Sequence, residues 1–149
     1  MEISETKRVP APPQQTWDAL LNPEILKACI PGCQSLEGNY IDGFEAVAMQ
    51  KVGPIRATFK AVVSISNVVP GESCRIEGHG KGGVAGFAKG HADVQLNSDA
   101  EGTLLAYQVD IQIGGKIAQL GSRIIKGFAT KLTEQFFEDF QEQVTAGLV

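Results

Sequence analysis

Apolar and polar residues alternate over a long segment that begins directly after Gly53-Pro54. In residues 55–65 every second residue is apolar, and Val62 is the one apolar residue among the positions between them. A period of two predicts a half-buried strand. Gly-Pro predicts a sharp turn, because glycine can take a positive φ while proline fixes its own φ and has no N–H to donate. The chain therefore turns at Gly53-Pro54 and enters a strand at 55–68.

The same kind of pattern predicts six further strands. We expect them at 2–9, 34–40, 41–52, 73–81, 87–97 and 103–113. Gly/Pro/Asp clusters separate the later strands, and consecutive strands with short connections form an antiparallel meander. Two short helices are expected after the first strand, one at 14–21 and one that follows Asn22-Pro23. Asparagine is a good helix N-cap and proline a good first helical residue.

The last 30 or so residues change period. Apolar residues from Ile117 to Val144 recur mostly at steps of three or four, which predicts an amphipathic helix from about residue 119 to about 147. Steps of four dominate, so the apolar stripe drifts around the helix by about 40° per step. A drifting stripe suits a helix held by a curved surface. We therefore predict a single α+β domain over 1–149, with a curved seven-stranded antiparallel sheet around a long C-terminal helix and two short helices after strand 1.

The face of the sheet that should meet this helix contains unusually small residues. Gly78, Gly80, Ala88, Gly90 and Ala92 all fall on it. Because protein interiors leave few voids, either the helix backbone approaches closely there or a space remains for a ligand. In the second case the sequence predicts a cavity with these walls: Phe59, Gly78, Gly80, Ala88, Gly90, Tyr107, Ile111, Leu120, Ile124 and Phe128.

Several apolar residues fall in the predicted turns at one end of the sheet. Such residues either fold back onto the core or form a mouth that opens toward a membrane or a partner subunit. The predicted rim of this mouth consists of Val52, Gly53, Pro54, Ile55, Gly82, Gly83, Val84, Phe87, Ile113 and Ile117.

Composition restricts the class of protein. The chain has 149 residues, enough for one domain with a real core, and a net charge of −4. The acidic balance argues against a nucleic-acid binder. No apolar run is long enough to cross a bilayer, and the N-terminus lacks the pattern of a signal peptide, so we expect a cytoplasmic protein. Cys29, Cys33 and Cys74 lack the paired spacing of a zinc site, and we expect buried thiols and no bound metal.

The sequence offers no catalytic constellation. It contains no nucleophile elbow, zinc-protease motif, phosphate loop or dinucleotide fingerprint. His79 and His91 should point away from the helix, where a cross-strand cluster with Glu77 or Asp93 could form. On the inner face Tyr107 is the main polar group, with Glu45 or Asp42 as further candidates. We therefore predict no catalytic residue.

A set of motifs carries a resemblance to a known family. They are Ala11-Pro12-Pro13, Thr16-Trp17, Asn22-Pro23-Glu24, Cys29-Ile30-Pro31-Gly32-Cys33, Lys51-Val52-Gly53-Pro54-Ile55, the Gly-rich hairpin, and Gly115-Lys116-Ile117-Ala118-Gln119-Leu120-Gly121. Together they resemble the family of the carbon monoxide dehydrogenase G subunit, which belongs to the START-like (SRPBCC) superfamily of helix-grip folds. The resemblance covers nearly the whole chain.

The resemblance implies an apolar cavity between sheet and helix and an association with molybdenum hydroxylases of the carbon monoxide dehydrogenase type. It also implies a role in membrane recruitment of that enzyme and in handling a lipophilic quinone. Longer members carry a C-terminal extension that ends in a membrane-seeking helix, whereas this chain stops at Val149. We therefore expect any contact with the inner face of the membrane to be peripheral.

Three functions remain open at this point. The protein could be a non-enzymatic accessory protein that holds a lipophilic molecule, with no covalently bound cofactor, and serves a molybdenum hydroxylase. It could be an assembly subunit whose cavity is empty. It could also be a hydrolase, cyclase or isomerase, for which the cavity would need an ionisable group.

Overall fold

Seven strands form one antiparallel sheet, in the order β1-β7-β6-β5-β4-β3-β2, in a computed structural model that describes residues 1–146. The strands are β1 (Glu2–Val9), β2 (Cys33–Asn39), β3 (Gly43–Val52), β4 (Ile55–Val69), β5 (Ser73–Lys81), β6 (Phe87–Asp99) and β7 (Gly102–Gly114). All seven predicted strands are present, with ends shifted by two residues at most. The predicted antiparallel α+β class is confirmed.

Two short helices connect the opposite edges of the sheet. Helix α1 (Pro13–Leu20) and helix α2 (Pro23–Cys29) lie between β1 at one edge and β2 at the other. Each begins with proline at its first helical position, and the Asn22 side chain accepts a hydrogen bond of 2.9 Å from the Glu24 N–H. The cap satisfies one of the N–H groups that a helix start leaves without an intrahelical partner.

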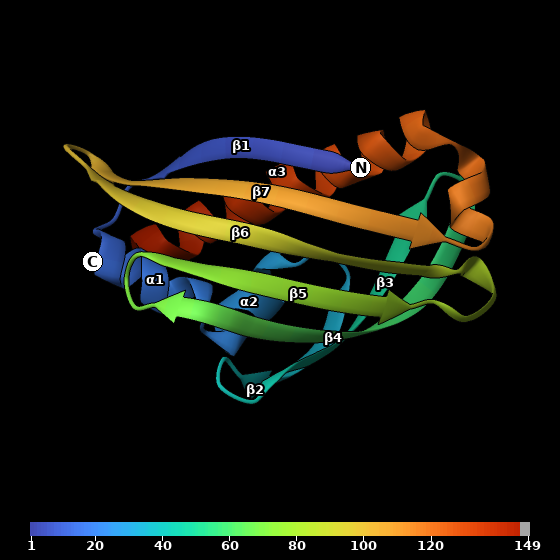
Figure 1. Cartoon of the computed structure of the whole chain (residues 1–149), viewed down its shortest axis with the longest axis horizontal. Helices are drawn as coiled ribbons and strands as arrows, with labels where there is room; N and C mark the ends of the chain where they lie inside the picture. Colours follow the sequence, from blue (N-terminus) through green and yellow to red (C-terminus); the bar gives the residue numbers. More distant parts are fainter. Residues whose placement is uncertain (147–149) are drawn as a thin grey trace.

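Helix α3 (Ser122–Ala146) runs along the length of the sheet, on the side that also carries α1 and α2 (Figure 1). It begins later than predicted. Gln119 and Leu120, expected in its first turn, belong instead to a separate 3-10 helix, η2 (Lys116–Leu120), and Gly121 separates the two helices with φ of 91°. A positive φ cannot continue a right-handed helix, so the chain changes direction there. The predicted end near residue 147 lies outside the described residues.

Three connections meet at one end of the molecule, at the right of Figure 1. They are the β3–β4 turn, the 3-10 helix η1 (Gly83–Ala85) between β5 and β6, and η2. Gly53 in the first turn lies beside Leu120 and Ile124, and Gly86 lies against the backbone of Gly114 and Gly115. We call this end, made of residues 52–55, 82–87 and 113–124, the mouth end.

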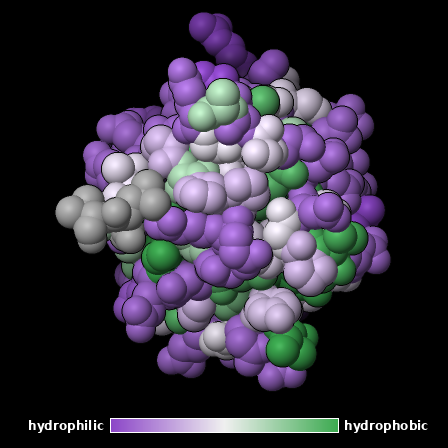
Figure 2. Space-filling view, turned by 90° about the vertical axis from the view of Figure 1, so that its left-hand side faces the viewer, coloured by the Kyte–Doolittle hydropathy of each residue, from purple (hydrophilic) through white to green (hydrophobic). Residues whose placement is uncertain are grey.

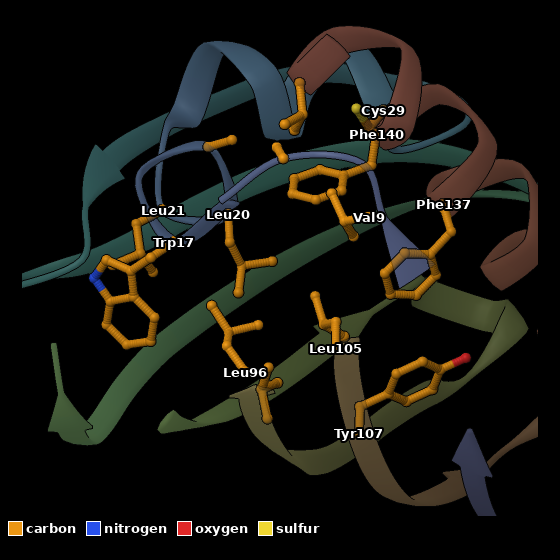
Figure 3. Packing of buried hydrophobic residues seen from close by; sticks show 14 of the residues in the cluster. Val9, Trp17, Leu20, Leu21, Cys29, Leu96, Leu105, Tyr107, Phe137 and Phe140 are labelled. Atoms are coloured by element: carbon orange, nitrogen blue, oxygen red, sulfur yellow. The ribbon is translucent and has the colours of Figure 1, made fainter. Parts of the chain in front are cut away.

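Most buried side chains form one cluster at the other end. Figure 3 shows Trp17 and Leu20 from α1, Leu96 and Leu105 from the sheet, and Phe140 from α3 packed together. Phe140 is fully buried and stacks on Phe136, with 5.8 Å between ring centroids. This large cluster fixes the second half of α3 against the sheet and against α1 and α2.

Candidate ligand-binding site

A second, smaller cluster closes the mouth end. It consists of buried Val52, Ala85 and Ile117, against which six half-buried residues pack: Ile55, Ala57, Phe59, Ile113, Leu120 and Phe128. In the described part of the chain the large and small clusters share no member. The apolar core between sheet and helix is therefore divided into two parts.

Small residues of the central strands lie between the two clusters. In register across the sheet, Val63, Gly78, Gly90 and Ile111 form one cross-strand row. The next row toward the mouth end contains Ala61, Gly80 and Ala88, followed by Ile113 of the small cluster. None of Val63, Gly78, Gly80, Ala88, Gly90 and Ile111 is fully buried.

Gly78 and Gly80 decide between the two explanations for these small residues. A Cβ placed on Gly78 would have only the Val63 side chain within 4 Å, at 3.8 Å. A Cβ on Gly80 would meet nothing nearer than the Ala61 Cβ, also at 3.8 Å. The nearest atoms come from neighbouring strands and none comes from α3. Helix α3 therefore has no atom within 4 Å of a Cβ at either position, where the contacts would be ordinary ones with β4 and β6. We call the region between these glycines and α3 the inner gap.

Gly90 has a different role from the one expected of a cavity wall. A Cβ at this position would lie 2.3 Å from the Asp110 carbonyl oxygen and 3.1 Å from the Ile111 Cα. The backbone of β7 occupies the place that a side chain would need. Glycine at this position permits the close approach of β6 and β7, and a larger residue would displace β7 instead of filling the inner gap.

The other predicted wall residues separate into groups. Ala88 and Ile111 border the inner gap together with Gly78 and Gly80. Phe59, Leu120 and Phe128 belong to the small cluster, and Tyr107 to the large one. Ile124 is 41% exposed, beside the Gly53 turn. The described structure therefore places part of the predicted wall at the ends of the inner gap and Ile124 outside it.

Half of the predicted rim is folded back onto the core. Val52 and Ile117 are buried, Ile55 and Ile113 pack on the small cluster, and Gly82 lies against the Phe59 ring. Gly53, Pro54 and Gly83 are exposed. Val84 and Phe87 differ from the other apolar rim residues, because they are 94% and 40% exposed. The small cluster thus closes the mouth end, and two apolar side chains, Val84 and Phe87, protrude from it.

A polar pair that the sequence analysis missed lies on the inner side of the edge strand β1. The Tyr107 hydroxyl donates a hydrogen bond of 2.6 Å to Glu5 Oε2, and Lys7 Nζ lies 3.3 Å from the same oxygen. The phenol, which stacks on Phe137 at 5.3 Å, holds the pKa of the Glu5 carboxyl below its ordinary value. Burial and the Glu5 carboxylate raise the pKa of Tyr107.

The signal for this pair was present in the sequence. Ile3 and Val9 were expected on one side of the first strand, and residues spaced by two share a face. Glu5 and Lys7 fall in the same phase as Ile3 and Val9, so the alternation already assigned them to the inner face.

The other candidate acids and both histidines lie elsewhere. Glu45 is exposed in register with outward-facing Val62, and Asp42 accepts a hydrogen bond from Asn39 in the β2–β3 turn. His91 lies on the outer face in register with Glu77 and Asp110. Within residues 1–146 no group of three or more His, Cys, Asp or Glu residues is arranged to hold a metal ion.

Solved structures with the same architecture define the class of this protein. A conserved protein from Geobacillus kaustophilus is 26% identical, with a TM-score of 0.91 over 98% of this chain and 96% of that chain. A protein from Thermus thermophilus is 14% identical, with a TM-score of 0.71 over 99% of both chains. Ara h 8.0201 is 16% identical, with a TM-score of 0.66 over 98% of both. The fold is a helix-grip fold.

Residues 6–145 match the family of the carbon monoxide dehydrogenase G subunit (CoxG). The chain belongs to this family, and the resemblance noted in the sequence is confirmed. A search of curated proteins found no match. In the described residues, no helix combines the length and apolarity needed to cross a membrane.

Proposed function

We propose that this protein is a non-catalytic accessory protein of a carbon monoxide dehydrogenase-type molybdenum hydroxylase, and that it holds a lipophilic small molecule in the inner gap. The separation of the core into two clusters carries the proposal. An apolar space that side chains leave unfilled costs packing energy, and a ligand that occupies it restores the lost contacts. The family to which the chain belongs supplies the enzyme system.

A quinone is the ligand class that we favour. The walls of the inner gap are aliphatic, from Ala61, Val63, Ala88 and Ile111, and they suit a flat or chain-like apolar molecule. The carrier would act in the cytoplasm at the inner face of the membrane, where it would couple the hydroxylase to the respiratory chain. An assembly subunit with an empty gap is the alternative.

Native mass spectrometry of protein purified from its own host tests this proposal. We expect the native mass to exceed the mass of the polypeptide alone. The excess should disappear when the protein is extracted with organic solvent, and the extract should contain a quinone. Gly80→Leu, which adds an apolar side chain to the inner gap, should abolish the additional mass. Wild-type protein with no bound molecule, and no affinity for added menaquinone in detergent, would favour the assembly subunit.

A further inference from the structure

The inner gap is bounded by very different amounts of core at its two ends. The large cluster, with 15 buried residues among those described, fills the space between sheet and helix at one end. The surface over that end is largely hydrophilic (Figure 2). At the mouth end the small cluster has three buried residues. A lipophilic molecule that moves between the inner gap and the outside therefore meets the weaker barrier at the mouth end.

Two of the three connections at the mouth end are fixed by pairing within the sheet. The β3–β4 turn joins strands that stay in register up to Val52 and Ile55. The loop that contains η1 joins the paired strands β5 and β6, and the Gly82 N–H donates a 2.8 Å hydrogen bond to the Gly86 carbonyl oxygen. Both connections are therefore hairpin ends that their own strands hold in place.

The third connection, which leads through η2 into α3, has no such support. Within the described part of the chain, no hydrogen bond or ion pair joins residues 116–127 to another strand or helix. The N–H groups of Ala118, Gly121 and Ile125 donate to carbonyl oxygens three or four residues earlier, at 3.1, 3.4 and 3.3 Å. These bonds are longer than the typical value of about 2.9 Å.

A few apolar side chains attach this segment to the sheet. Ile117 is buried in the small cluster, Leu120 packs against the same cluster, and Ile125 is buried one turn into α3. Ile124, beside the Gly53 turn, is 41% exposed. The segment is therefore held by packing alone, and mainly by Ile117.

The start of α3 is also poorly stabilised as a helix. Gly121 precedes the helix and has no side chain that could cap its free N–H groups. The first turn contains Arg123 and no acidic residue, which opposes the helix dipole. Gly127 lowers helix propensity, and a Cβ there would have no atom within 4 Å, so packing does not require glycine.

The rest of the helix is firmly attached. The Gln141 side chain donates a 2.6 Å hydrogen bond to the Arg8 carbonyl oxygen on β1, and the Phe137 ring stacks on Tyr107. Phe140 is fully buried in the large cluster. Helix α3 thus has a fixed second half and a weakly held first part.

The chain just before the segment is fixed as well. A Cβ on Gly115 would lie 2.5 Å from the Gly86 Cα, so the two backbones are in contact there. Gly115 has φ of 82°, in the region where glycine is the residue that moves most freely. The weakly held segment is therefore bounded by a glycine at a fixed point, Gly115, and by Gly127 within the helix.

We propose that residues 116–127, at the right of Figure 1, form a lid that opens as a unit about Gly115 and Gly127 and gives a lipophilic molecule its route into the inner gap. Opening withdraws Ile117 and Leu120 from the small cluster and leaves the hairpin ends in place. The motion is a property of the fold, and only its use as a ligand route rests on the proposed carrier function.

Hydrogen–deuterium exchange of the full chain without ligand tests the lid. We expect the amides of residues 117–126 to exchange at least about 100-fold faster than those of residues 134–144. Gly127→Ala favours the helix without a new contact, and should slow exchange in the lid about fourfold. Ile117→Ala removes the main attachment and should accelerate it at least about tenfold. Ile41→Ala, at a 77% exposed position in the β2–β3 turn, is the matched control and should change neither.

Stopped-flow binding of menaquinone in mild detergent tests the route. Because Gly127→Ala stabilises the closed lid and its methyl group faces solvent, the association and dissociation rate constants should both fall about fourfold, at unchanged Kd. Equal exchange in the lid and in the second half of α3 would overturn the lid. Slower lid exchange with unchanged rate constants would overturn the route. A rapidly exchanging lid in a protein that binds no menaquinone would refute the carrier function and leave the lid standing.

Discussion

Tyr107 on β7 and Glu5 on β1 face each other in register at the edge of the sheet, and the phenol donates a 2.6 Å hydrogen bond to the carboxylate. The bond links the edge strand to a buried ring that stacks on Phe137 of α3. It therefore fastens β1, β7 and α3 at one point, with Lys7 on the same oxygen.

Tyr107→Phe should return the pKa of Glu5 toward its ordinary value, because the phenol is the main cause of the lowered pKa. A lowered carboxyl pKa stabilises the fold above the unfolded-state pKa, and this stabilisation is lost as pH falls through the folded-state pKa. We expect the free energy of unfolding of the variant to be about 1 kcal/mol lower than that of wild type at neutral pH. Its deficit relative to wild type should shrink in acid.

Carboxyl NMR titration and urea unfolding measure these two effects. Tyr40→Phe is the matched control, since Tyr40 is 40% exposed in the β2–β3 turn. A Glu5 titration unchanged in Tyr107→Phe would contradict the assigned cause.

Alanine substitutions of the central glycines should have opposite effects. Gly78→Ala and Gly80→Ala place a methyl group at an ordinary contact distance of 3.8 Å from its nearest neighbour and reduce the freedom of the unfolded chain, so we expect each to raise the free energy of unfolding by about 0.5 kcal/mol. Gly90→Ala forces the methyl group onto the β7 backbone and should cost about 1–3 kcal/mol. Urea unfolding of the three variants is the measurement, and equal effects at Gly78 and Gly90 would refute the inner gap.

The two clusters should contribute unequally to stability. Phe140→Ala removes the ring at the centre of the large cluster and should lower the free energy of unfolding by about 3–5 kcal/mol. Phe128→Ala affects only the half-buried edge of the small cluster, and we expect about half that loss. Chemical denaturation compares the two variants. Equal losses would indicate one continuous core in place of two.

The buried thiols should make the free energy of unfolding depend on pH in the alkaline range. Burial raises the pKa of Cys29 and of Cys74 to about 11, from 9.0. In the unfolded chain these thiols ionise at lower pH, so the unfolding free energy should fall as pH rises from 9 to 11. Cys29→Ala/Cys74→Ala should flatten this dependence when measured by urea unfolding. An equally steep fall in the double variant would exclude the thiols as its cause.

The strands and the topology could be predicted because their signals are local. Alternation in β4 and the Gly53-Pro54 turn depend on neighbouring residues alone. The break at Gly121 was missed because an apolar pattern continues across it, from Leu120 to Ile124.

Features that depend on distant contacts could not be predicted. Gly78 and Gly90 share a face and a residue type, yet a Cβ would make only an ordinary contact with Val63 at Gly78 and would collide with the β7 backbone at Gly90. Likewise, Val52 at the end of β3 and Val84 in η1 are both valines beside a turn. Val52 is buried because it packs with Ala85 and Ile117, whereas Val84 is exposed.

The inner gap as a binding site for a lipophilic molecule is the central claim, and a menaquinone titration of purified protein in mild detergent tests it most directly. Quenching of the fluorescence of Trp17, the only tryptophan in the sequence, gives the affinity for menaquinone. Wild type and the control Ala28→Leu, on the exposed side of α2, should bind equally. Gly80→Leu should bind at least about tenfold more weakly while remaining folded. Equal affinity in all three proteins, or none in wild type, would contradict the account.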